Sequence, residues 1–171
     1  MESNDKQAPA QEERDKYSVS LRFYGDDLDP DEVSGLLGSP PSGSVRRGDL
    51  VQLRTRSFTA PSGSWRLSTG QSTDDIETQL VAMFGRLTDD LSVWQSLTSR
   101  FDADLFCGVF LVWQGHGFGM SPRLHRLLAD RNLPIVFDIY ASDGPDENAP
   151  VPEVMPPGTL MEQHGTRNHP S

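Results

Sequence analysis

The stretch that decides the fold is YSVSLRFYGDDLDPDEVSGLLGSPPS, residues 17–42. Apolar and polar residues alternate from Val19 to Phe23, which is the period of a strand with one buried face. Asp29 and Pro30 then have the residue types of a helix N-cap and of the first helical position, and Gly38 is typical of a helix end. The stretch therefore predicts a strand followed by a helix, and it carries no evident catalytic group.

Two further alternating segments predict two more strands. They are Leu50–Arg56 and Trp65–Thr69, and the Pro- and Gly-containing segment Ser57–Ser64 between them predicts a hairpin loop. If both strands join the sheet of the first one, Val51 and Leu53 face the helices.

The second half of the chain has the pattern of helices followed by a buried strand. Ser72–Asp75 offers a polar cap and acidic residues before an apolar repeat of three to four residues over 76–94. Gly85 and Thr88 divide this repeat into two predicted helices, the second capped by Thr88. The continuous apolar run Leu105–Trp113 predicts a central strand that is covered on both faces.

A short helix beginning at Ser121 and a strand over Leu133–Tyr140 complete the predicted order, βαββαβαβ. This order predicts an α+β fold of two layers, in which helices cover one face of a mainly antiparallel sheet. Its first six elements predict a ferredoxin-like βαββαβ arrangement with an added αβ unit. We expect a single domain over residues 17–141, with a disordered tail at 1–16 and a disordered, Pro-rich acidic tail at 142–171.

The composition of the chain argues against several classes of function. Its 25 acidic and 15 basic residues give a formal net charge of −10, so a nucleic-acid partner is not expected. The single cysteine, Cys107, excludes an intramolecular disulfide and a cysteine zinc cluster. The N-terminus lacks a secretion signal, and no apolar run approaches the roughly 20 residues that span a bilayer. We therefore expect a cytoplasmic protein that does not bind membranes.

Several short motifs resemble those of a bacterial domain-of-unknown-function family, number 4279. The resemblance covers about residues 17–141, and its motifs are FYGDDLDP at 23–30, LLGSPP at 36–41, RGD at 47–49, GSWRLST at 63–69 and FDIY at 137–140. It implies a small bacterial domain with no assigned activity, and it supplies no catalytic residues.

Two sequence motifs suggest ligand sites but have the wrong spacing. The acids between Asp26 and Glu32 lack the glycine and the glutamate that an EF-hand calcium loop requires at its sixth and twelfth positions. Gly115–Gly119 follows an apolar strand, as in a dinucleotide fingerprint, but its third glycine comes one position early. We interpret the first motif as turn and cap residues. The second is either a strand-to-helix loop or an anion loop formed by Gly117, Gly119 and Ser121.

No group of residues in the sequence predicts a catalytic or metal centre. The four histidines are scattered, and no two are spaced to ligate a metal from one helix face. Cys107 is more typical of a buried hydrophobic residue than of a nucleophile. We expect no cofactor and no metal, and we consider an enzymatic function the less favoured hypothesis.

The arginines of the predicted strands are the binding site that we favour. Strand alternation is expected to place them on the sheet face opposite the helices, beside Tyr24; they are Arg22, Arg54, Arg56 and Arg66. Guanidinium groups in such a row suit an acidic protein surface or a phosphate. The alternative is an ordinary solvated face whose charges are balanced by acids such as Asp138.

The sequence leaves two classes of function open. We favour a non-catalytic protein-binding module, of which an immunity-type protein that blocks a toxin is one form. The alternative is a sensor or an enzyme that binds a small ligand or a phosphate through the Gly115–Ser121 loop. The oligomeric state is not determined by the sequence.

Overall fold

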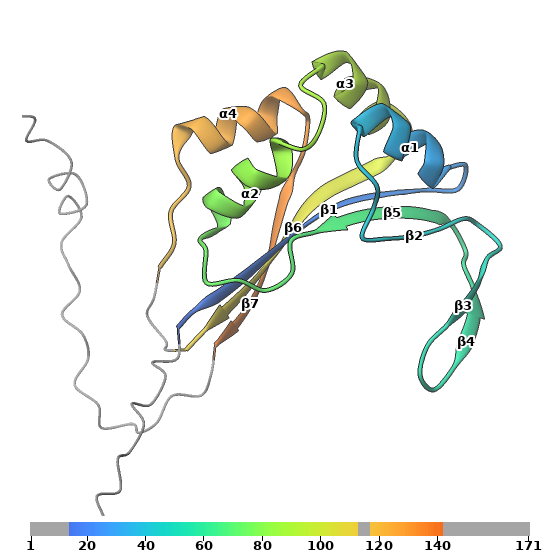
Figure 1. The fold of residues 1–171 in the computed structure, drawn as a ribbon, viewed down its shortest axis with the longest axis horizontal. Coiled ribbons are helices and arrows are strands. Elements are labelled where there is room, and N and C mark those ends of the chain that lie inside the picture. Colours follow the sequence, from blue (N-terminus) through green and yellow to red (C-terminus); the bar gives the residue numbers. More distant parts are fainter. Residues whose placement is uncertain (1–13, 113–116, 142–171) are drawn as a thin grey trace, which may run out of the picture.

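The computed structural model describes residues 14–112 and 117–141. Within them, a five-stranded sheet has the strand order β2-β5-β1-β6-β7, and β3 and β4 form a separate two-stranded ribbon. The strands are β1 (Lys16–Gly25), β2 (Gly43–Val45), β3 (Leu50–Gln52), β4 (Ser57–Thr59), β5 (Gly63–Ser68), β6 (Asp102–Leu111) and β7 (Ile135–Ala141). The helices are α1 (Pro30–Leu37), α2 (Ile76–Phe84), α3 (Leu91–Arg100) and α4 (Pro122–Asp130). All four cover the same face of the sheet (Figure 1).

The five-stranded sheet is mixed. β1 pairs antiparallel with β5 and β6, β5 pairs antiparallel with β2, and only the pair β6–β7 is parallel. A parallel neighbour requires a crossover connection, and α4 lies in the connection between β6 and β7. The predicted α+β class and the mainly antiparallel sheet are therefore confirmed.

The first helix begins at the predicted cap, and the second begins at Asp75, one of the acids expected to follow a small polar cap. The side chain of Asp29 accepts a hydrogen bond from the backbone N–H of Asp31 at 3.0 Å, and α1 ends at Gly38 with φ of 77°. Asp75 accepts a bond from the N–H of Thr78 at 2.6 Å and caps α2. These acids satisfy backbone donors that a helix start leaves without partners, which explains their place in the sequence.

The predicted division between the second and third helices is confirmed, but its cap is not Thr88. The side chain of Asp90 accepts from the N–H of Ser92 at 2.9 Å and caps α3. The hydroxyl of Thr88 instead accepts a bond from the N–H of Asp90 at 3.2 Å. The short carboxylate of Asp90 is placed one residue before the helix, where it reaches the free N–H groups.

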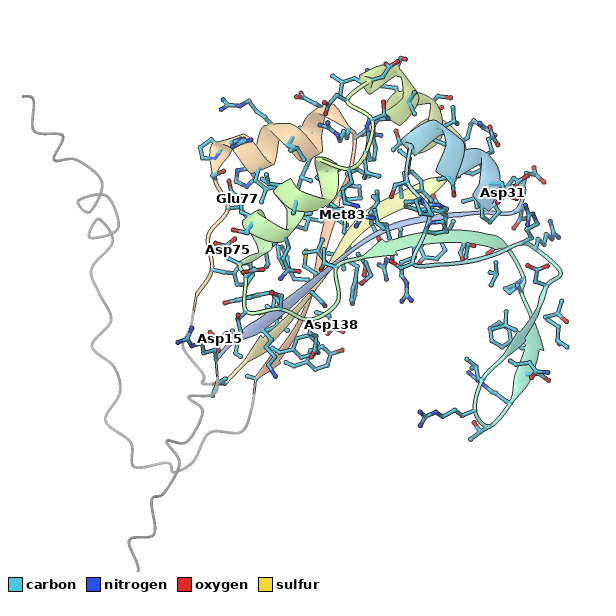
Figure 2. All side chains as sticks on the ribbon, in the orientation of Figure 1. Asp15, Asp31, Asp75, Glu77, Met83 and Asp138 are labelled. Atoms are coloured by element: carbon cyan, nitrogen blue, oxygen red, sulfur yellow. The ribbon has the colours of Figure 1, made fainter. Side chains whose placement is uncertain are left out.

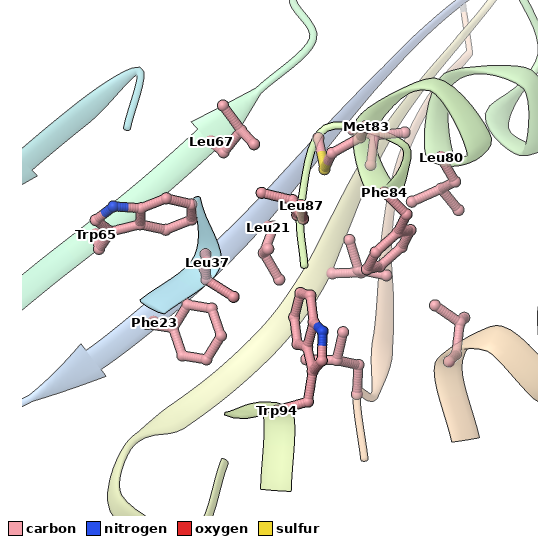
Figure 3. Packing of buried hydrophobic residues seen from close by; sticks show 14 of the residues in the cluster. Leu21, Phe23, Leu37, Trp65, Leu67, Leu80, Met83, Phe84, Leu87 and Trp94 are labelled. Carbon is pink, nitrogen blue, oxygen red and sulfur yellow. The ribbon is translucent and has the colours of Figure 1, made fainter. Parts of the chain in front are cut away.

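The hydrophobic core fills the space between the sheet and the helices (Figure 3). Three β1 residues, Val19, Leu21 and Phe23, are completely buried, as the alternation predicted. The ring of Phe23 lies 6.0 Å from that of Trp65 in β5 and 6.4 Å from that of Trp94 in α3. Large aromatic rings therefore join β1, β5 and α3 directly, and their burial supplies a large share of the hydrophobic stabilisation.

The prediction of a strand over Leu50–Arg56 in the main sheet is wrong. β3 covers only the first three of these residues and pairs with β4, which lies in the segment predicted as a loop. Leu53, expected in the core, is 49% exposed, and the β3–β4 ribbon projects from the sheet on the side away from the helices (Figure 1). The sheet edge next to β5 is occupied instead by β2, so the ferredoxin-like arrangement is not confirmed.

A second correction concerns β6. It lies between β1 and β7, as expected of a central strand, but helices cover it on one face only. Leu105, Cys107 and Val109 are fully buried on that face, whereas Phe106 and Phe110 on the other face are only partly buried. The apolar run is therefore continuous because Phe106 and Phe110 occupy the uncovered face, not because helices cover both faces of the strand.

The expected tails fall mostly outside the described residues, which exclude 1–13 and 142–171. The three described residues of the N-terminal tail are ordered: β1 begins at Lys16, and Asp15 accepts a hydrogen bond from the N–H of Val112 at 2.8 Å. None of the helices in the described part of the chain is long and apolar enough to cross a membrane.

Candidate functional site

The side of the sheet opposite the helices is the candidate site, and we call it the outer face. Side chains alternate along a strand, so the neighbours of the buried Leu21 and Phe23 lie on this side. Its larger side chains are Lys16, Arg22 and Tyr24 of β1, Arg66 of β5, Asp104, Phe106 and Phe110 of β6, and Val136, Asp138 and Tyr140 of β7. Figure 2 shows Asp138 on this side, away from the helices.

Arg22 lies on the outer face as predicted, but its charge is matched internally. Its Nε and Nη2 donate hydrogen bonds of 2.7 and 2.6 Å to the two carboxylate oxygens of Asp104. The guanidinium plane also lies 4.3 Å from the ring centre of Phe106. The hydrogen bond to Asp104 raises the pKa of Arg22, and the pair holds the group in one orientation. Arg22 therefore forms part of a rigid surface.

Arg66 is placed differently, although it lies directly opposite Arg22 in the β1–β5 register. Its side chain is exposed, and it forms no ion pair with any residue between 14 and 112 or between 117 and 141. Two like charges on directly opposed strand positions are unfavourable, and Asp104 relieves this by neutralising only Arg22. Arg66 is thus a cation that can bind an external anionic group.

Aromatic side chains occupy the other end of the outer face. The rings of Phe110 and Tyr140 stack with centres 5.0 Å apart and planes 6° apart, and Tyr140 remains 52% exposed. The hydroxyl of Tyr140 donates a hydrogen bond to the carboxylate of Asp138, which raises the pKa of Tyr140. Asp138, proposed from sequence as a partner for the arginines, is therefore held by Tyr140.

Gly108 keeps the middle of the outer face flat. A Cβ atom at this position would lie 2.7 Å from the hydroxyl oxygen of Ser18 and 3.0 Å from the ring of Phe110. The first distance is too short for a real contact and the second is tight, so a side chain at residue 108 would displace the Ser18 hydroxyl and push against the ring of Phe110. On the outer face, Gly108 therefore lies between the Phe110–Tyr140 pair and the Arg22–Asp104 pair.

Two predicted members of the arginine row do not lie on the sheet. Arg54 and Arg56 belong to the loop that joins β3 to β4, in which the N–H of Leu53 donates to the carbonyl of Arg56 at 2.8 Å. The prediction failed because β4 follows β3 after four residues and pairs with it locally. Tyr24, by contrast, is on the outer face as predicted, with its ring centre 5.8 Å from the guanidinium of Arg22.

A carboxylate of the same chain already binds Ser121, the last residue of the loop before α4. Glu77 of α2 accepts hydrogen bonds from the backbone N–H and the hydroxyl of Ser121, at 3.2 and 2.7 Å, and lies between α2 and α4 (Figure 2). Gly117 and Gly119 are exposed, and the start of the loop lies outside the described residues. The positive end of α4 therefore faces a carboxylate of the same chain.

The acids of the calcium-like motif have arginine partners. Asp29 and Asp31 both bind Arg46, and Glu32 forms two hydrogen bonds with Arg100 at 2.7 and 3.0 Å. In the described part of the chain, no group of three or more histidine, cysteine, aspartate or glutamate side chains is arranged to hold a metal ion. These acids tie α1 to the β2–β3 connection and to α3.

Cys107 has the environment of a core residue. It is completely buried, and this burial raises the pKa of its thiol to about 12. A thiol with such a pKa is neutral at physiological pH and is a poor nucleophile. The interpretation of Cys107 as a small hydrophobic residue agrees with this environment.

The residues of the outer face that sequence reasoning missed are aromatic. Phe106 and Phe110 were assigned to a strand covered on both faces because they stand in an apolar run, and Tyr140 was assigned only to a last strand. Their signal is alternation: in a sheet covered on one face, every second residue of β6 and β7 must lie on the uncovered side.

Comparison with known proteins places the chain in a family but not in a functional class. No significant match was found among curated proteins or among solved structures. The family model described as domain of unknown function DUF4279 matches residues 15–142, which is most of the chain and includes the whole five-stranded sheet. The chain therefore belongs to the DUF4279 family.

Proposed function

We propose that the chain is a non-catalytic protein-binding module of the bacterial cytosol, which binds a partner through its outer face. The observation that carries the proposal is a sheet face without helices that presents both exposed aromatic rings and Arg66, which forms no ion pair with any described residue. Aromatic residues and arginine contribute most of the binding energy in protein interfaces. A toxin-blocking, immunity-type role is one form of this function.

The composition of the outer face indicates the kind of partner. Its exposed large hydrophobic residues are Tyr140, Val136 and Tyr24, whose exposed fractions are 52, 41 and 38% respectively. Arg66 stands on β5, next to the opposite edge strand β2, and Arg54 and Arg56 lie on the β3–β4 ribbon. A partner with an apolar centre and carboxylates near the arginines would match both features.

The rigidity of the face supports binding without a large entropic penalty. Arg22 is held by Asp104 and Phe106, and Tyr140 is held by Phe110 and Asp138. Side chains that are already ordered lose little conformational freedom on association. The alternative function, a phosphate or small-ligand site at the Gly115–Ser121 loop, has less support because Glu77 binds Ser121 there.

The test is a comparison of binding partners between the wild type and two matched variants. The face variant carries Arg66→Glu and Tyr140→Ser, and the control variant carries Arg126→Glu on the exposed side of α4. We expect a partner captured by the wild type and the control to be lost with the face variant. Purified partner should then bind the face variant at least tenfold more weakly in calorimetry, a loss of about 1.4 kcal/mol.

Equal melting temperatures for the three proteins would show that the face variant is folded. Equal affinity of the partner for the face variant and the wild type would exclude the outer face as the binding site.

A further inference from the structure

The segment that follows β7 is chemically matched to the outer face. Residues 143–157, DGPDENAPVPEVMPP, contain four acids, five prolines and no basic residue. Pro-rich segments with extended backbones are bound by surfaces lined with aromatic side chains, because the proline rings pack on the aromatic ones. The outer face presents such rings together with Arg66.

Charge complementarity favours this segment over the rest of the chain. Arg66, Arg54 and Arg56 form no ion pair with the described residues, whereas Arg22, Arg46, Arg47 and Arg100 all do. The N-terminal residues 1–13 contain a single proline and also a lysine, so they match the face less well. The acids at 143, 146, 147 and 153 are therefore the best internal candidates to pair with these arginines.

The point of attachment and the length of the segment also fit. The chain leaves β7 at Ala141, next to Tyr140 and its stacked partner Phe110. From there to Arg66 the path crosses three strand spacings and about seven residues along the strands, a distance of about 27 Å. An extended Pro-rich chain advances about 3.1 Å per residue, so about nine residues cover this distance and Glu153 reaches Arg66 with length to spare.

We propose that residues 143–157 bind the outer face of their own chain, running from the Phe110–Tyr140 pair across Gly108 toward Arg66. The segment is tethered, so its local concentration at the face is of the order of 1 mM. It therefore competes with an external partner, and only a partner of higher effective affinity displaces it. This inference rests on the proposed function of the outer face and adds its regulation.

The experiment compares backbone amide and Arg66 Nε–H signals by nuclear magnetic resonance in the full-length protein. The acid variant carries Asp143→Asn, Asp146→Asn, Glu147→Gln and Glu153→Gln, and the proline variant carries serine at 150, 152, 156 and 157. The control carries Glu162→Gln and Pro170→Ser, outside the segment. We expect both segment variants to shift the signals of Ser20, Arg66, Gly108 and Tyr140 and to leave those of α3 unchanged, and the control to shift neither.

A peptide with the sequence of residues 143–157 supplies the second arm of the experiment. Added to the proline variant, it should restore the wild-type signals of the outer face. The wild type should bind it about tenfold more weakly, as expected if an internal segment at about 1 mM competes with an affinity of about 100 µM.

Three results would overturn the inference. They are unchanged face signals in both segment variants, shifts confined to the helices, and wild-type signals that change on dilution, which would identify a second copy as the occupant. None of these would exclude an external partner, because the partner comparison with Arg66→Glu and Tyr140→Ser tests the proposed function separately.

Discussion

Arg22 and Arg66 face each other across β1 and β5, but within residues 14–112 and 117–141 only Arg22 has a carboxylate partner. The partner, Asp104, comes from β6 on the other side of β1. Each carboxylate can neutralise one guanidinium in a two-bond geometry, so Asp104 decides which arginine is structural and which is available to a ligand.

We expect Arg22→Met to lower the free energy of unfolding by about 1 kcal/mol, because it leaves Asp104 partly buried without its partner. The pair is about a fifth exposed, so solvent screening keeps the effect modest. Asp104→Asn should cost a similar amount, and the double variant should cost less than the sum. Urea unfolding of the four proteins measures this coupling, and an additive result would show that the pair does not stabilise the fold.

Cys107 makes stability fall at alkaline pH. Its pKa is about 12 in the folded protein and about 8.5 in an unfolded chain, so between these values the unfolded chain loses the proton first. The contribution is fully present below about pH 8.5 and is lost as the pH rises toward 12. The wild type should therefore lose stability relative to Cys107→Ala between pH 8 and pH 10, as measured by urea unfolding. A constant difference between the two proteins would contradict this prediction.

At the scale of elements, one side chain joins α2 to the start of α4. Ser121 caps α4 by accepting from the N–H of Leu124 at 3.2 Å, and it also donates to Glu77. The contact holds the two helices together at the end of the loop.

We expect Ser121→Ala to lower the free energy of unfolding by about 1 kcal/mol, because it removes both the helix cap and the bond that the hydroxyl donates to Glu77. Ser121→Thr is the control, since it keeps a hydroxyl at the cap position. Thermal unfolding of both variants checks the prediction. Equal losses for alanine and threonine would show that side-chain size, not the hydroxyl, matters at this position.

The β3–β4 ribbon should contribute little to stability. Leu53 is 49% exposed on the ribbon, whereas Leu67 of β5 is almost completely buried. We expect Leu53→Ser to change the free energy of unfolding by less than about 0.5 kcal/mol and Leu67→Ala to reduce it by about 2–4 kcal/mol. Urea denaturation distinguishes the two, and a large loss from Leu53→Ser would place the ribbon against the core.

At the scale of the whole molecule, all four helices share one core with one face of the sheet. Trp65 of β5 and Trp94 of α3 both contact Phe23, so neither layer has a separate core. We therefore expect unfolding in a single cooperative transition. Far-ultraviolet circular dichroism and tryptophan fluorescence should give the same midpoint in urea, and two midpoints would show that the layers unfold independently.

Local patterns were sufficient to predict most elements of the fold. The alternation from Val19 to Phe23, the capping residue Asp29 and the helix start at Ser121 involve groups only a few residues apart. Their hydrogen bonds and burial depend on neighbours in the chain, so the same residues predict the same structure in many contexts.

The site was predicted less completely, because alternation alone does not say which strands share a sheet. Leu50–Arg56 has the same pattern as Trp65–Thr69, yet it pairs with its own neighbour and takes Arg54 and Arg56 away from Arg22 and Arg66. The aromatic residues of β6 were assigned to a second covered face, since a continuous apolar run does not distinguish two helical layers from one.

The sequence by itself determined that this chain is an α+β domain with capped helices and a buried thiol. Only the tertiary structure decided that β6 lies between β1 and β7, and so brought Asp104 to Arg22 and Phe110 to Tyr140. The physical reason is that strand pairing joins segments far apart in the chain. Its choice depends on the packing of the complete core against the helices, which no local pattern of residues contains.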